Sequence, residues 1–82
     1  MQLALSKNAQ REYEKIPKQE RTKIKKKLIS LEANPRSGKK LSGELSDYYS
    51  LRAWPYRIIY EINAKQNLIQ IHKISHRQGV YK

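Results

Sequence analysis

Several residue types that small proteins use for covalent staples or metal binding are missing or scarce in this chain. There is no cysteine, which excludes a disulfide framework, a thiolate zinc site and a cysteine nucleophile. Aspartate, glutamate and histidine nowhere cluster with the spacing of metal ligands, so we expect neither a metal nor any other cofactor. No apolar run approaches the roughly 18 residues of a membrane span, and the first residues do not resemble a signal peptide. We therefore expect a cytoplasmic protein with no membrane partner.

Apolar residues are also few. The 82 residues are 38% hydrophobic, whereas average domains are about 45–50% apolar. A chain of this length forms one domain, residues 1–82, that hides only about 60–65% of the surface exposed by the unfolded chain. The sequence therefore predicts a thin core and marginal stability unless a partner binds.

Acidic residues are outnumbered by basic ones. The chain has 7 aspartates and glutamates against 18 lysines and arginines, which gives a net charge of +11. Such an excess in a short chain indicates a polyanionic partner, either nucleic acid or an acidic protein. Residues 1–43 carry +8 of this charge and residues 44–82 carry +3. The first half is therefore the candidate for general electrostatic contact and the second half for specific chemistry.

The first half of the chain predicts a strand and two helices. Residues 3–6 are short and apolar, and Ser6 or Asn8 could cap the helix that follows. Pro17 either ends that helix or starts a second one, which spans Lys18 to Ala33. Apolar residues recur at helical spacing, so that each helix has one buried face. These residues are Ala9, Tyr13 and Ile16 in the first helix, and Ile24, Leu28 and Leu31 in the second.

Lysines crowd the remaining faces of the second helix at positions 23, 25, 26 and 27. They can belong to an ordinary solvated helix or follow the phosphates of an RNA, and the two interpretations are compatible. Neither interpretation makes them catalytic. We take Lys23, Lys26 and Lys27 as candidate RNA-binding residues.

The second half changes to a period of two, which is typical of strands. Residues 48–54 and 56–62 alternate, residues 63–67 form a hairpin loop, and residues 68–75 form a third strand suited to a central position. The predicted order is β-α-α-β-β-β. The fold class is therefore α+β, with two helices packed on one face of a small, mainly antiparallel sheet.

Alternation along the strands separates two faces of this sheet. The apolar set should meet the helices; it consists of Tyr49, Leu51, Tyr56, Ile58, Tyr60 and Ile62. The opposite face collects Tyr48, Ser50, Arg52, Arg57 and Glu61. Arginines and phenols on an uncovered face can bind phosphates and stack on bases, so Tyr48, Ser50 and Arg52 are candidate RNA-binding residues. The alternative is that Arg57 and Glu61 are only charge partners on a solvated sheet.

The last residues read "ISHRQGVYK" and carry an imidazole, a guanidinium and a phenol. Alternation puts His76 in phase with His72, which we take as structural. If the end of the third strand lies beside Arg57, then Arg57, Arg77 and one of His76 or Tyr81 converge. Such a set could cleave RNA by attack of the ribose 2′-hydroxyl, with cations holding the phosphate and an acid–base group moving protons. Histidine suits that task near neutral pH, whereas tyrosine needs a lowered pKa.

These residues resemble a known family. The chain contains "LRAWPYRIIYEI", then a hairpin and "IHKISHRQGVY", preceded by "NPRSGKKLSG". Over residues 3–81 this is similar to the RelE/ParE toxin superfamily of toxin–antitoxin systems, and the "HR..VY" ending resembles its RelE branch. The resemblance implies a type II toxin that cleaves mRNA on the ribosome, inhibits translation and is bound by an acidic antitoxin. It also implies a monomeric free toxin that forms a hetero-oligomer with the antitoxin.

The resemblance assigns roles to particular residues. Arg57 and Arg77 match the family's phosphate-binding arginines, and Tyr81 matches its terminal tyrosine. Well-known members carry two lysines on the strand before the turn, one of them active in acid–base chemistry, but here those positions are Tyr48 and Ser50.

Because of that departure, His76 and Tyr81 could do more of the proton transfer, or catalysis could be weak. Two other functions therefore stay open. One is a gyrase-inhibiting toxin of the ParE type, and the other is a non-catalytic module that binds RNA or the ribosome.

Overall fold

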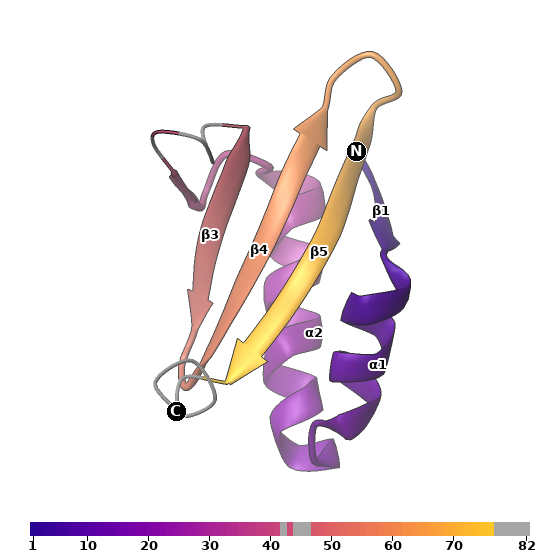
Figure 1. Ribbon diagram of the computed structural model, residues 1–82, viewed down its shortest axis with the longest axis vertical. Coiled ribbons are helices and arrows are strands. Elements are labelled where there is room, and N and C mark those ends of the chain that lie inside the picture. Colours follow the sequence, from indigo (N-terminus) through magenta and orange to yellow (C-terminus); the bar gives the residue numbers. More distant parts are fainter. Residues whose placement is uncertain (42, 44–46, 77–82) are drawn as a thin grey trace.

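The computed structural model describes residues 1–41, 43 and 47–76. Two helices lie on one face of a five-stranded sheet, and the other face is uncovered, as Figure 1 shows. The elements are β1 (Gln2–Leu5), α1 (Lys7–Lys15), α2 (Lys18–Ala33), β2 (Lys39–Lys40), β3 (Tyr48–Ala53), β4 (Tyr56–Asn63) and β5 (Leu68–His76). The strand order is β1-β5-β4-β3-β2, with β1 and β5 parallel and the other pairs antiparallel. The predicted α+β class is confirmed, as is the central place of β5; the two-residue β2 was not predicted.

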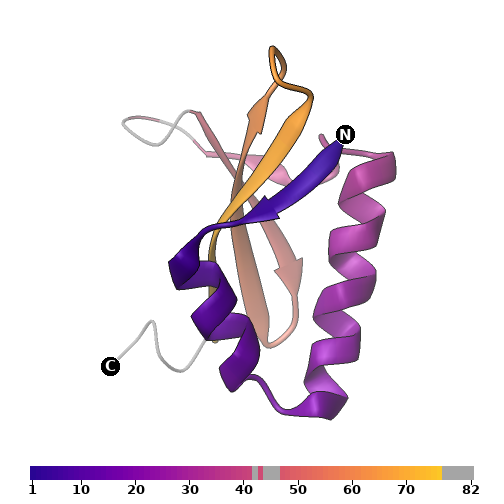
Figure 2. The same ribbon diagram turned by 90° about the vertical axis from the view of Figure 1, so that its right-hand side faces the viewer.

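The first turns of both helices follow from local hydrogen bonds. The Ser6 side chain accepts a hydrogen bond from the Ala9 backbone N–H at 3.1 Å, so Ser6 rather than Asn8 is the N-cap. Pro17 lacks an N–H, and its carbonyl accepts the first hydrogen bonds of α2 from Glu20 and Arg21, each at 2.9 Å. The chain therefore turns sharply between the helices, and α2 extends along the back of the sheet, as seen from its β1 edge in Figure 2.

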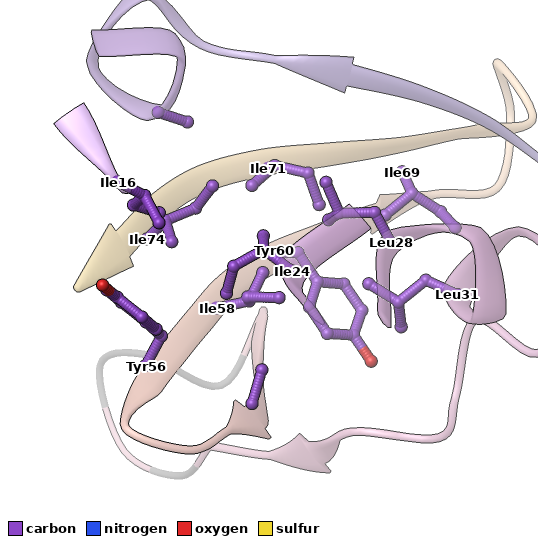
Figure 3. Close-up of a cluster of buried hydrophobic side chains, with 12 residues drawn as sticks. Ile16, Ile24, Leu28, Leu31, Tyr56, Ile58, Tyr60, Ile69, Ile71 and Ile74 are labelled. Carbon is purple, nitrogen blue, oxygen red and sulfur yellow. The ribbon is translucent and has the colours of Figure 1, made fainter. Parts of the chain in front are cut away.

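A single cluster of buried side chains forms the core between the sheet and the helices (Figure 3). Its members are Ala9, Ile16, Ile24, Leu28, Leu31, Ala53, Tyr56, Ile58, Tyr60, Ile69, Ile71 and Ile74. Each residue of β3 and β4 predicted to face the helices is buried or partly buried against this cluster. Burial of these groups is the main driving force for folding. The strand alternation therefore correctly separated the core face from the open face.

The pairing of β5 with β4 contains a register shift. Ile58 pairs with Ile74 and Ile59 with Lys73, but the next residue, Tyr60, pairs with Ile71. One additional residue of β5 is therefore accommodated, as in a β-bulge, and the alternation changes phase there. This explains why Ile71 and Ile74, three positions apart, are both buried.

Helix α1 also bonds to the backbone of β5 beside this shift. The Ser6 N–H donates to the Ile71 carbonyl at 2.9 Å, and the Ser6 hydroxyl donates to the His72 carbonyl at 3.1 Å. The Ile74 N–H donates to the Glu12 carboxylate at 2.9 Å. Because β1 ends at Leu5, these contacts satisfy backbone groups of β5 that would otherwise lack a neighbouring strand. The irregular part of β5 is thereby fixed in place.

Candidate functional site

Two arginines lie side by side on the open face of the sheet. Arg52 of β3 and Arg57 of β4 are cross-strand partners near the turn that joins these strands, and both are exposed. Paired residues project from the same face of a sheet. Within the part of the chain that the structure describes, neither guanidinium has an ion-pair partner. Two like charges held together without a counter-ion favour an anionic ligand.

A groove of about 550 Å³ adjoins both arginines. It is lined by Ser37, Gly38, Lys39, Leu41, Ser50, Leu51, Arg52 and Arg57. Three of these side chains are cationic and none is acidic, so the groove is suited to an anionic group such as a phosphate. The structure thus places Ser50, Arg52 and Arg57 together as predicted, and it adds Lys39, which the sequence analysis had not singled out. Lys39 could be recognised as part of the groove only once its pairing with Ser50 across β2 and β3 was known.

A buried phenol, that of Tyr60, binds the segment around Gly38 that lines the groove. Tyr60 is fully buried; its hydroxyl donates to the Pro35 carbonyl at 2.8 Å and accepts from the Gly38 N–H at 3.0 Å. Burial raises the pKa of this phenol, although the Gly38 hydrogen bond opposes the rise. A Cβ atom at Gly38 would lie 2.5 Å from the Tyr60 oxygen and 3.0 Å from the Ser50 carbonyl oxygen. Glycine therefore lets the segment pack directly on Tyr60 and sets the shape of the groove.

Farther along the open face, three side chains from three strands meet. His72 of β5 lies 3.0 Å from the Glu61 carboxylate of β4, measured from Nε2 to Oε1. The His72 ring packs edge to face with the ring of Tyr48 from β3, with centroids 5.1 Å apart. Glu61 therefore binds His72 and not Arg57, so the alternative of an Arg57–Glu61 pair is wrong. Alternation had placed Tyr48 and Glu61 on this face, but His72 could not be added to them from the sequence, because the phase change in β5 decides what His72 faces.

The end of β5 lies beside Arg57, because Arg57 pairs with Ser75, so the condition set for a convergent site is met up to that residue. His76 pairs instead with Tyr56, whose ring it contacts at a centroid distance of 5.0 Å. The prediction that His76 is in phase with His72 is wrong, since the register shift between them puts His76 on the side of the helices. Arg77 and Tyr81 lie outside the described residues, so their convergence with Arg57 stays a prediction.

Tyr56 occupies the corner between the sheet and α2. Its pKa is raised by burial and also by the nearby Glu20 carboxylate, while Lys23 acts in the opposite direction. The Lys23 ammonium is 2.9 Å from Glu20 and donates to the Trp54 carbonyl at 3.0 Å. Lys23 thus connects α2 to the β3–β4 turn. This contact gives Lys23 a structural task that the prediction of RNA binding did not include.

The other lysines of α2, at positions 18, 25, 26 and 27, are exposed. They belong to a helix that packs behind the sheet, whereas the groove opens near β2, β3 and β4. Lys26 and Lys27 therefore stay predicted RNA-binding residues, but at a distance from the groove. This position fits general electrostatic attraction rather than chemistry.

Two further properties concern metals and membranes. The described residues contain no group of three or more His, Asp or Glu side chains that could hold a metal ion. In the same part of the chain, no helix has both the length and the apolar character needed to cross a bilayer.

Comparison with known proteins gives a consistent family. The model of the family described as "ParE toxin of type II toxin–antitoxin system, parDE" matches residues 3–81. No curated protein sequence matches the chain.

Several solved toxin structures have the same fold. The RelBE2 toxin–antitoxin complex from Mycobacterium tuberculosis matches with 27% identity and a TM-score of 0.85, covering 93% of this chain and 96% of that chain. The isolated RelE toxin of E. coli matches with 26% identity and a TM-score of 0.79, covering 92% of this chain and 82% of that chain. The archaeal RelE–RelB complex from Pyrococcus horikoshii matches with 26% identity and a TM-score of 0.77, covering 93% of each chain. The chain therefore belongs to the ParE toxin family of type II toxin–antitoxin systems and is a RelE-like member of the RelE/ParE superfamily.

Proposed function

We propose that this toxin is an endoribonuclease that cleaves mRNA on the ribosome and so inhibits translation. The observation that carries the proposal is the pair of exposed guanidinium groups, Arg52 and Arg57, beside a groove lined by a third cation, Lys39. Within the described residues neither guanidinium has an ion-pair partner, so the two like charges repel each other until an anion binds. An RNA phosphate neutralises them and fits the fork of an arginine.

The proposed reaction is a transesterification at phosphorus. The ribose 2′-oxygen bonds to the adjacent phosphorus, its proton passes to a base, and the bond to the 5′-oxygen breaks as that oxygen takes up a proton. The products are a 2′,3′-cyclic phosphate and a free 5′-hydroxyl. Arg57, with Arg77, holds the phosphoryl oxygens while charge develops on them. Arg52 assists in orienting the strand.

Proton transfer is assigned to Tyr81, with His76 as its rival. The lysines that act in related toxins are replaced here by Tyr48 and Ser50, so another group must move the protons. His76 lies on the helix side, next to Tyr56, whereas Arg57 projects from the open face. That geometry favours Tyr81, whose phenol requires nearby arginines to lower its pKa.

The partner of the free toxin is proposed to be an acidic antitoxin. RelBE2 and the archaeal RelE–RelB protein are complexes of a toxin with its antitoxin. A net charge of +11 on this chain suits an acidic partner, with which it would form a hetero-oligomer.

The test is single-turnover cleavage of mRNA on programmed ribosomes. Arg57→Ala should lower the rate by about 10²–10³-fold, because it removes a preorganised charge from the transition state. Arg11→Ala is the matched control, since Arg11 is an exposed arginine of α1, and it should cleave at the wild-type rate.

A different result would favour another function. Unchanged rates in Arg57→Ala, Arg77→Ala and Tyr81→Phe together would contradict the nuclease. The match to the ParE family would then favour a toxin that inhibits gyrase, detected as DNA damage without RNA cuts.

A further inference from the structure

The cluster of Tyr48, His72 and Glu61 lies on the same open face as the arginine pair. Tyr48 pairs with Glu61 across β3 and β4, and Arg52 pairs with Arg57 in the same two strands. Glu61 is four residues from Arg57 along β4, which corresponds to about 13 Å. An RNA strand whose phosphate is bound at Arg57 can therefore extend across this cluster. The two features form adjoining parts of one surface.

Polar atoms of the cluster are available to a ligand. Glu61 uses one carboxylate oxygen, Oε1, to bind Nε2 of His72. Within the described residues, its other oxygen and Nδ1 of His72 have no hydrogen-bond partner, and the two side chains are 38% and 31% exposed. The contact with Glu61 limits the rotation of the His72 ring, and Tyr48 packs against that ring. The acceptor and the two rings are thus arranged before any ligand arrives.

We propose that Tyr48, His72 and Glu61 form a binding subsite for one unpaired RNA base next to the cleaved phosphate. Aromatic side chains stack on splayed bases, and carboxylates accept hydrogen bonds from exocyclic amino groups. Cytosine, adenine and guanine carry an amino group, whereas uracil has none and its single donor, N3–H, lies between two carbonyl oxygens that a carboxylate repels. The subsite therefore selects against uracil. This inference rests on the proposed function in one respect, namely that RNA lies along the open face.

The main alternative is that the cluster only stabilises the sheet. A partly exposed contact between a histidine and a carboxylate contributes at most a small amount to stability, because solvent screens it. If the cluster only stabilised the sheet, its side chains would not need to contact RNA. The two explanations therefore differ in a property that can be measured.

The first measurement is binding without cleavage. Single-stranded RNA trinucleotides with 2′-methoxy groups are titrated into the wild-type protein, and the imidazole signals of His72 are followed by NMR. We expect these signals to shift. Trinucleotides with cytosine, adenine or guanine at one position should bind about 5- to 100-fold more tightly than the trinucleotide with uracil at that position. An unshifted His72, or equal affinity for all four bases at every position, would overturn the subsite.

The second measurement uses Glu61→Gln. A glutamine amide both donates and accepts hydrogen bonds, so discrimination against uracil should shrink towards unity while binding at the phosphate persists. Glu32→Gln is the charge-matched control, because Glu32 is an exposed residue of α2, and it should keep the wild-type preference. A preference that survives unchanged in Glu61→Gln would overturn the proposal.

Mapping of cleavage sites separates this inference from the proposed function. If wild-type protein shows base preference in binding but cuts no mRNA, the nuclease fails and the subsite stands. If it cuts mRNA with the same base preference in Glu61→Gln as in wild type, the nuclease stands and the subsite fails. Arg57→Ala should reduce cleavage at all sites alike, whereas Glu61→Gln should redistribute it among sites.

Discussion

Tyr60 shows how one side chain can serve the core and the groove together. Its ring belongs to the buried cluster (Figure 3). Its hydroxyl binds both Pro35 and Gly38 on the segment that leads to β2. The alternation of β4 predicted the buried ring. The two partners of the hydroxyl could not be predicted, because they depend on how a loop without periodicity folds back over the sheet. Core packing therefore decides the position of Lys39 in the groove.

Replacement of Tyr60 by phenylalanine should destabilise the protein. The change leaves the Pro35 carbonyl and the Gly38 N–H without their partner, which costs roughly 1–3 kcal/mol. The loss is measured by urea denaturation followed by circular dichroism. A free energy of unfolding equal to that of the wild type would show that water replaces the phenol at no cost.

The Tyr60→Phe variant should also differ from the wild type in how its free energy of unfolding responds to alkaline pH. Because the pKa of Tyr60 is raised in the folded protein, its stabilising contribution is complete below about pH 10 and is lost as the pH rises through the folded pKa. The wild-type free energy of unfolding should therefore fall more steeply above pH 10 than that of Tyr60→Phe. Denaturation curves between pH 8 and 11 test this, and parallel slopes would contradict it.

Tyr81→Phe distinguishes the two tasks that a phenol can have at the proposed site. A ring that only stacks on a base is preserved by the change, and cleavage should continue. A phenol that transfers a proton is not preserved, and the rate should fall by about 10²–10⁴-fold. We expect the larger loss, because the lysines of related toxins are absent here. His76→Gln is the comparison, and a larger loss in that variant would transfer the role to His76.

At the scale of elements, regular segments were predictable and irregular ones were not. Both helices and the two long hairpin strands follow from apolar periodicity, which directly reflects burial. Two features did not follow: the short strand β2 and the change of phase in β5. A change of phase depends on which backbone groups find partners, and here α1 supplies them through Ser6 and Glu12. The faces of His72 and His76 were therefore assigned incorrectly to a common side.

The lysines of α2 should separate into structural and electrostatic residues. Lys23→Gln removes an ion pair and a bond to the Trp54 carbonyl, so it should lower stability by about 0.5–1 kcal/mol. Replacement of Lys25, Lys26 and Lys27 by glutamine should leave stability nearly unchanged. It should instead weaken ribosome binding and reduce its dependence on salt.

Thermal melting and salt-dependent ribosome binding check these expectations. The triple variant should still cleave at the wild-type rate when ribosomes are saturating. Loss of cleavage under that condition would mean that α2 carries part of the active surface, contrary to its position behind the sheet.

At the scale of the molecule, the chain combines a small core with a large positive charge. The two helices and one sheet face supply nearly all of the buried surface among the described residues, and the other face stays open to a ligand. Repulsion among like charges opposes the compact state. A polyanion that binds only the folded protein would remove part of that repulsion. Binding and stability should therefore be coupled throughout the molecule.

This coupling predicts a large difference in melting temperature between the free toxin and its complex with the proposed acidic antitoxin. A partner present at 100 times its Kd stabilises the folded state by about 2.7 kcal/mol. For a domain of this size, that corresponds to an increase of about 10–20 °C. Added salt should raise the melting temperature of the free toxin, because it screens repulsion between exposed charges, and should raise that of the complex less. Calorimetry of both forms at low and high NaCl provides the measurement. Equal melting temperatures for the two forms would contradict the coupling of binding and stability. A melting temperature of the free toxin that does not rise with salt would show that the charge of +11 is not what limits the stability of this fold.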